Sequence, residues 1–241
     1  MIQISNLLVF YLLTLWASFC YGQTRVYRAD TRSPDQLRTV GGFMPRGLGG
    51  ALQVAPNVSM YNHARGAVNG QSTDSDGYVS TTITEARAIQ FLEESLGGSG
   101  YVYTVAGARN FVQVSGTLGQ YSPYVDELEY AALGGFHWSR VIGWAQYRGD
   151  PSGPVQVGAF ISNEDYDPTR YGNDAVNQGE PSLAGFPGGH AGWSLAPWNA
   201  FANGNCGRKL RLRQSNCKSA ATAVALAQAF LDKECSGGAC S

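Results

Sequence analysis

The position of the cysteines constrains the fold of this chain more than any other feature. Of the five cysteines, one lies at position 20 and the others lie near the end, at Cys206, Cys217, Cys235 and Cys240. The region before Cys206 must therefore hold its fold by packing alone, and at about 180 residues it is long enough to bury a core. An even number of cysteines in an exported chain favours disulfides over metal ligands, and four cysteines allow three pairings.

The first 22 residues are predicted to be a secretory signal peptide. An apolar core runs from Leu7 to Trp16 and is followed by short side chains up to Gly22, after which we expect cleavage. This core is too short to span a bilayer, and no later stretch is apolar enough to do so. We therefore expect a secreted protein without a membrane segment, from which Cys20 has been removed.

The composition is typical of a compact, loop-rich domain that contains β-structure. Charged residues make up 15% of the chain, glycine occurs 31 times, and the net charge of -1 gives no argument for nucleic-acid binding. Apolar spacing at Ala88, Phe91, Leu92 and Leu96 predicts a helix over 85–96 that stops at Gly97. Other runs predict strands at 25–30, 78–84, 101–106, 111–114 and 155–161, and a helix at 218–234. Together these elements predict an α+β fold.

Two carboxylates, Glu127 and Glu129, are separated by a single residue and precede a run of small side chains. In an extended strand both would project to the same face, where like charges shift each other's pKa. Taken alone, the spacing is explained better by a solvated strand edge or turn than by an active site. Arg28 and Asp30 would likewise share one face of the first strand, and a structural ion pair is the commoner explanation for them.

Two loops have alternative interpretations. The polar segment 67–76 has no apolar anchor, which predicts a mobile loop that is either a lid or merely solvated. Four cations lie between Cys206 and Cys217, at Arg208, Lys209, Arg211 and Arg213. They form either a nucleic-acid or heparin patch or an exposed loop that a protease cuts. We favour the processing loop, because nicking concentrates in exposed loops and no other basic surface accompanies the cluster.

The sequence contains no zinc-ligand spacing, nucleophile elbow or phosphate-binding loop. It does contain a set of motifs in a fixed order: YRADTR at 27–32, GGFMPRG at 41–47, HARG at 63–66, DGYVSTT at 76–82, YSP at 121–123, DELE at 126–129, ALGG at 132–135 and LAGFP at 183–187. This set resembles the cholera toxin and heat-labile enterotoxin A subunit family of arginine-specific mono-ADP-ribosyltransferase toxins. The resemblance covers roughly 25–217 and implies an α+β fold with two packed β-sheets around an NAD cleft and peripheral helices.

The resemblance also implies roles for individual residues. Glu129 would stabilise the ribose cation that forms when NAD loses nicotinamide, and Glu127 would orient and deprotonate the target arginine. Tyr130 would crowd the corner that Glu127 occupies. The NAD-binding set comprises Arg28, which would bind the pyrophosphate, Ala29, Asp30, Thr31, Arg32, His63 on a strand of its own, and Ser80, which would fix Glu129, with Thr81 and Thr82 in support. No metal is expected.

The same resemblance implies how the chain is divided and what it acts on. We expect a signal peptide (1–22), a catalytic domain (23–205), a processing loop closed by a Cys206–Cys217 disulfide (206–217) and a short helical tail (218–241). The expected target is an arginine of a host GTP-binding protein alpha subunit, modified inside host cells after the bridge is reduced.

The short tail ends without a retrieval signal, so we expect the linker that threads a receptor-binding B subunit to be absent or shortened. Two alternatives have the same fold: a secreted NAD glycohydrolase and an inactive extracellular binding module.

Overall fold

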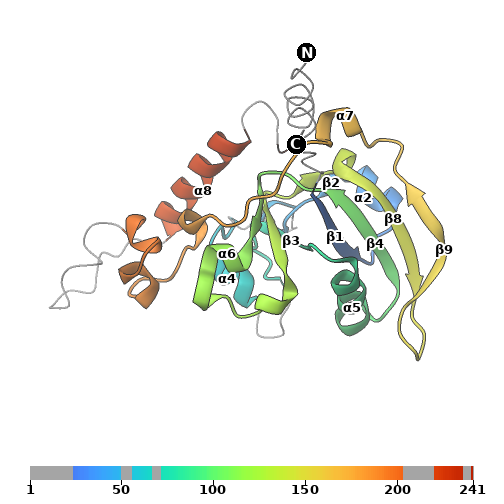
Figure 1. The fold of residues 1–241 in the computed structure, drawn as a ribbon, viewed down its shortest axis with the longest axis horizontal. Helices are drawn as coiled ribbons and strands as arrows, with labels where there is room; N and C mark the ends of the chain where they lie inside the picture. The colour runs from blue at the N-terminus through green and yellow to red at the C-terminus, as the bar shows by residue number, and fades with distance from the viewer. Residues whose placement is uncertain (1–23, 50–55, 67–71, 203–219, 236–239, 241) are drawn as a thin grey trace, which may run out of the picture.

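The computed structural model describes residues 24–49, 56–66, 72–202, 220–235 and 240 (Figure 1). The expected signal peptide and the processing loop with Cys206 and Cys217 lie outside the described residues, as does the first half of the loop at 67–76. No helix in the described part of the chain is long and apolar enough to cross a membrane.

A seven-stranded antiparallel sheet forms the centre of the fold, in the order β5-β6-β3-β1-β4-β8-β9 (Figure 1). Its strands are β1 (Arg25–Asp30), β3 (Tyr78–Thr82), β4 (Gly100–Ala106), β5 (Phe111–Gln113), β6 (Glu129–Leu133), β8 (Val141–Arg148) and β9 (Val155–Ser162). Each predicted strand is present, with boundaries that differ by at most two residues. The prediction of an α+β fold is confirmed.

The sheet is weakly joined at its middle. Six residue pairs align β1 with β4 and five align β3 with β6, whereas β1 and β3 share only the pair Tyr27 and Thr82. Beyond that pair, the side chain of Arg28 crosses between the two strands, and its Nη1 donates to the Ser80 carbonyl oxygen over 2.7 Å. We call the line between β1 and β3 the seam.

A second, two-stranded sheet packs against the large one. It consists of β2 (Gly42–Phe43) and β7 (Phe136–His137). The ring of Phe43 lies 5.3 Å from that of Tyr103 on β4, and Phe136 lies 5.1 Å from Phe111 on β5. All four side chains are buried in one core, so the expected pair of packed sheets is confirmed.

Short helices surround the sheets, and their ends follow from local sequence. They are α2 (Pro34–Thr39), α3 (Arg46–Gly49), α4 (Met60–Arg65), α5 (Glu85–Leu96), α6 (Val114–Leu118), α7 (Pro168–Tyr171) and α8 (Ala220–Glu234). Ser33 and Gln36 form a reciprocal capping box at the start of α2. Gly97 adopts the left-handed conformation that ends α5, as predicted. Buried Ala88 and Leu92 place α5 against β1 and β4.

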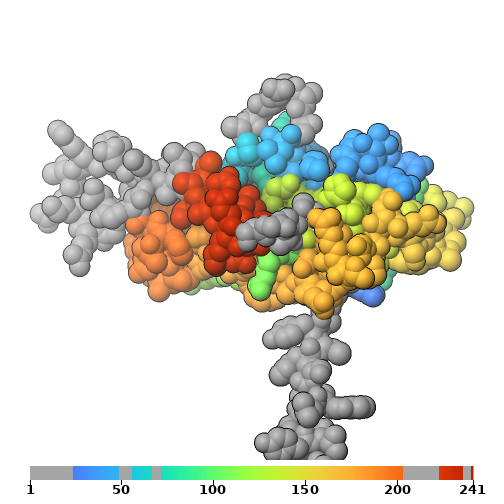
Figure 2. Space-filling view, turned by 90° about the horizontal axis from the view of Figure 1, so that it is seen from above, coloured from blue at the N-terminus to red at the C-terminus, as the bar shows by residue number. Residues whose placement is uncertain are grey.

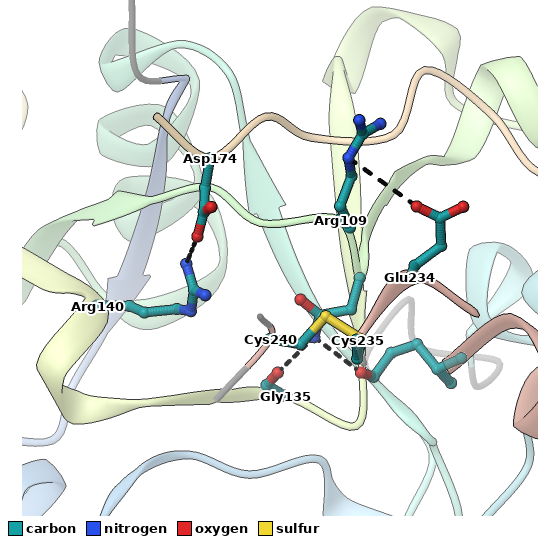
Figure 3. The surroundings of a disulfide bond; sticks show 9 residues. Arg109, Gly135, Arg140, Asp174, Glu234, Cys235 and Cys240 are labelled. Carbon is teal, nitrogen blue, oxygen red and sulfur yellow. Dashed lines mark hydrogen bonds and ion pairs between the residues drawn. A yellow bond between two sulfur atoms is a disulfide. The ribbon is translucent and has the colours of Figure 1, made fainter. Parts of the chain in front are cut away.

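The C-terminal helix α8 packs on the domain rather than standing apart. Ala227 and Phe230 are buried in a core that also contains Leu118 and Leu183. Figure 2 shows α8 (red) on the surface beside the orange segment that precedes residue 203. Cys235 and Cys240, whose pairing the sequence left open, form a disulfide just beyond the helix (Figure 3).

Candidate active site

Arg28 lies on β1 with its guanidinium between the two halves of the sheet. Besides the bond to Ser80, its Nη2 lies 3.4 Å from Asp30 Oδ2, and the group stacks 5.5 Å from the centroid of the Phe43 ring. Its Nε is buried and has no hydrogen-bond partner within the described part of the chain. A buried donor without a partner costs free energy, and an anionic ligand would satisfy it.

Asp30 orders the cations around it. Arg32 donates two hydrogen bonds to the Asp30 carboxylate, from Nε to Oδ1 at 2.9 Å and from Nη2 to Oδ2 at 2.7 Å. Burial alone would raise the pKa of Asp30, but the two guanidinium groups outweigh burial and lower it. The predicted pairing of Arg28 with Asp30 is confirmed. Of the other residues in this stretch, Ala29 faces away, into the core under α5, and Thr31 is exposed just after the strand.

His63 joins two carboxylates in a buried chain. Its Nδ1 lies 2.8 Å from Asp76 Oδ2, and its Nε2 lies 2.9 Å from Glu129 Oε1. The exposed fractions of the three side chains are 2% for His63, 3% for Asp76 and 13% for Glu129. Burial alone would lower the pKa of His63, but the charges of Glu129 and Asp76 prevail and raise it to about 10. The imidazole is therefore a cation at neutral pH.

The resemblance led us to expect His63 on a strand of its own. The residue lies instead in helix α4. The helix begins after Ser59, whose hydroxyl caps the Asn62 amide and also donates to the Gly185 carbonyl oxygen. The cap fixes the rotation of the helix, and α4 presents His63 to the sheet with its ring 5.0 Å from that of Tyr78. His63 therefore comes from a different element than expected, and it lies beside Glu129 with the expected site residues Arg28 and Ser80 close by.

Glu129 begins β6 and is held in its charged form. Burial raises its pKa, but the His63 cation, a hydrogen bond from the Ser80 side chain and the charge of Arg28 together lower it. The Ser80 hydroxyl also lies 3.5 Å from His63 Nε2. Ser80 and Glu129 meet because β3 and β6 pair in a register that aligns Thr82 with Glu129. The result is a rigid, ionised carboxylate beside two cations.

Glu127 does not share a strand with Glu129. It ends a 3-10 turn, η2 (Val125–Glu127), and Leu128 then adopts a left-handed φ of 48°. This turn breaks the alternation on which the expectation of a common face depended. The carboxylates still lie close: burial and the charge of Glu129 raise the pKa of Glu127, against the opposing effect of Arg87. Arg87 Nη2 contacts Glu127 Oε1 at 2.9 Å.

Two threonine hydroxyls fix the backbone that carries the glutamates. Thr81 Oγ1 donates to the Tyr130 carbonyl oxygen at 2.6 Å, and Thr82 Oγ1 donates to the Glu127 carbonyl oxygen at 3.0 Å. The side chain of Tyr130 is buried in the core between the sheets, and its hydroxyl donates to Gln178. Tyr130 therefore faces the core, on the side of β6 opposite Glu129, because successive residues of a strand face opposite sides, and it does not fill the corner we expected it to crowd.

Two residues at this site were assigned no role from the sequence. Asp76 ends a polar loop that we expected to be mobile, yet its carboxylate accepts from the Tyr78 amide and contacts His63. Arg87 stands in the first turn of an amphipathic helix, where a cation usually faces solvent. The DGYVSTT motif contains Asp76 but says nothing of its partner, and no sequence signal marks Arg87.

The arrangement supports a definite chemistry. An ionised carboxylate fixed by Ser80 and His63 stabilises positive charge that develops nearby. A buried guanidinium with an unsatisfied Nε binds an anion such as phosphate. A second carboxylate with a raised pKa takes up a proton more readily. Two neighbouring glutamates whose pKa values move in opposite directions therefore suit different steps of one reaction.

Comparison with known proteins identifies one family. The heat-labile enterotoxin alpha chain family matches residues 5–235. The A chain of Escherichia coli heat-labile enterotoxin IIB is 40% identical over 208 residues, 84% of this chain and 78% of that protein. The Vibrio cholerae NAD(+)--arginine ADP-ribosyltransferase Chelt is 34% identical over 227 residues, 88% of this chain and 36% of that protein. A solved heat-labile enterotoxin double mutant has a TM-score of 0.69 at 30% identity and covers 86% of this chain and 91% of its own.

Proposed function

This chain belongs to the heat-labile enterotoxin alpha chain family, and on that premise we propose that it transfers ADP-ribose from NAD to an arginine of a host protein. The relatives support a mono-ADP-ribosyltransferase toxin that uses NAD as its substrate. The arginine acceptor, and its place on a host GTP-binding protein alpha subunit, belong to our proposal and follow from the resemblance of the motifs.

The observation that carries the proposal is the division of labour between the two glutamates. In the first step the bond between nicotinamide and ribose breaks, the electron pair leaves with nicotinamide, and the ribose carbon becomes an oxocarbenium ion. Glu129, ionised and locked by His63 and Ser80, stabilises that cation. Arg28, with its unpaired Nε, binds the pyrophosphate of NAD. In the second step a guanidinium nitrogen of the acceptor attacks the ribose carbon and Glu127 takes its proton.

Secretion and processing complete the proposal. We propose that the signal peptide ends at residue 22, that the loop between Cys206 and Cys217 is nicked, and that reduction of their disulfide frees the enzyme in the host. The tail would remain attached to the domain until the buried contacts of α8 at Ala227 and Phe230 are broken.

The test uses the nicked and reduced full chain with labelled NAD and agmatine, a small guanidinium acceptor. A transferase releases nicotinamide and labels agmatine. Release without labelling would identify an NAD glycohydrolase, and no release would identify a binding module of the same fold. We expect Glu129→Gln to abolish both reactions and Glu127→Gln to lose labelling while keeping slow NAD hydrolysis. Glu93→Gln, an exposed carboxylate on α5, is the control and leaves both rates unchanged.

A further inference from the structure

Glu127 is held by a cation of the chain itself. Arg87, in the first turn of α5, contacts Glu127 Oε1 with Nη2 at 2.9 Å and Glu94 Oε2 with Nη1 at 3.3 Å. Its side chain is only 20% exposed, and Glu127 is 33% exposed. Gln90, one turn along the helix, donates to the other oxygen of Glu94 over 2.7 Å. A chain of polar contacts therefore runs from α5 to the carboxylate that precedes β6.

We propose that Arg87 is a positioning residue for the acceptor step, because it fixes the Glu127 carboxylate where the acceptor guanidinium must meet it. This inference rests on the proposed transferase function. Thr82 fixes the backbone of Glu127 through its carbonyl oxygen, and Arg87 fixes the side chain through one carboxylate oxygen. A carboxylate can accept from two guanidinium groups, because its two oxygens offer about four lone-pair sites.

Arg87 also stabilises the ionised form of Glu127, whereas the other surroundings of this side chain favour its neutral form. Burial, Glu129 on β6 and Asp126 on η2 all raise the pKa of Glu127, and Arg87 on α5 is the cation that lowers it. Replacing Arg87 by a neutral residue therefore raises the pKa of Glu127 further. The base is ionised only above its pKa, so the acidic limb of the transfer reaction moves to higher pH when Arg87 is removed.

Two measurable reactions, agmatine labelling and NAD hydrolysis, distinguish the acceptor step from the loss of nicotinamide. Arg87 contacts Glu127, whereas the cations around Glu129 are His63 and Arg28. The informative quantity is therefore the partition ratio, the rate of agmatine labelling divided by the rate of NAD hydrolysis. A general loss of structure lowers both rates and leaves this ratio unchanged.

The experiment compares the nicked and reduced full chain with its Arg87→Gln and Arg87→Lys variants, using NAD and agmatine. We expect Arg87→Gln to lower the partition ratio about tenfold, the value of one charge-assisted hydrogen bond, and to move the acidic limb of labelling upward in pH. Arg87→Lys keeps the charge but loses the planar fork, so we expect a smaller reduction, about threefold, and an acidic limb close to that of the unmodified chain. If Arg87→Gln does not fold, the Arg87→Lys variant alone provides the test.

The matched control is Arg148→Gln, an exposed arginine at the end of β8, three strands away from β3 in the sheet. Its partition ratio should equal that of the unmodified chain. An equal ratio and an unmoved acidic limb in the Arg87 variants would overturn the inference alone. An unmodified chain that hydrolyses NAD without labelling agmatine would overturn the proposed function and this inference together.

Discussion

The Nε2 of His63 lies 2.9 Å from Oε1 of Glu129, and both side chains are almost completely buried. The pair is an ion pair rather than a neutral hydrogen bond, because the pKa of His63 is raised to about 10 while that of Glu129 is lowered. Its charge state links stability to pH.

The unfolding free energy should therefore fall as pH rises through about 10. The folded pKa of His63 lies above its ordinary value of 6.5, so its stabilising contribution is complete below pH 6.5 and is lost as pH rises through about 10. Urea unfolding between pH 6 and 10.5 measures this slope. Because tyrosines and lysines also titrate in this range, the His63→Gln variant provides the reference. Equal slopes in the two proteins would contradict the assignment of an imidazolium.

Asp76→Asn should destabilise the fold and weaken the active site. The substitution keeps the shape of the side chain but leaves the His63 cation with one carboxylate instead of two, which we expect to cost about 3 kcal/mol of unfolding free energy. It should also lower the pKa of His63, visible in its ring nitrogen NMR shifts. The control is Asp74→Asn, whose carboxylate is 76% exposed and pairs with Arg46 at the surface. A loss of the same size in both variants would remove the special role of Asp76.

Arg28→Lys should reduce NAD hydrolysis about a hundredfold, because an ammonium lacks the planar donors that satisfy phosphate and the Ser80 carbonyl oxygen together. It should also lower the unfolding free energy by about 1 kcal/mol through the lost bond across the seam. Steady-state rates and urea unfolding check the two effects separately. Arg25→Lys changes an exposed arginine on the same strand and should alter neither. Full hydrolysis by Arg28→Lys would show that NAD binds elsewhere.

Phe230→Ala should cost about 3 kcal/mol of unfolding free energy, because its ring is 4% exposed and its removal leaves a cavity between α8 and the domain. Val224→Ala on the same helix is the control, since Val224 is 52% exposed and contributes little burial. Urea unfolding of the full chain measures both. Equal stability of the two variants would mean that α8 does not pack on the domain in solution.

The elements that the sequence predicted are those governed by local patterns. The apolar spacing of α5 and the alternation of β1 each depend on neighbours a few residues away. The contact between Arg28 and Asp30 follows in the same way, because residues two apart on a strand share a face.

The contacts that the sequence did not predict join distant segments. His63 contacts Asp76 at a separation of 13 residues and Glu129 at a separation of 66 residues, and such distances in sequence leave no periodic signal. The common face that Glu127 and Glu129 would share in an extended strand is not formed, because Leu128 adopts a positive φ, which is rare for a non-glycine residue and has no signal in the neighbouring sequence. Arg87 was missed because its partner comes from a turn forty residues later.

At the seam between β1 and β3, one side chain serves both the proposed reaction and the stability of the sheet. Where the backbones of β1 and β3 share a single residue pair, the guanidinium of Arg28 bonds to the Ser80 carbonyl oxygen and also holds the donor that we propose binds phosphate. A lineage that abandoned the reaction would still lose the bond across the seam, worth about 1 kcal/mol, if it replaced this arginine. We therefore expect a descendant that has lost the activity to retain Arg28 longer than Glu127. The side chain of Glu127 contacts Arg87 on α5 and does not join two strands. Loss of function in such a chain is best judged at Glu127.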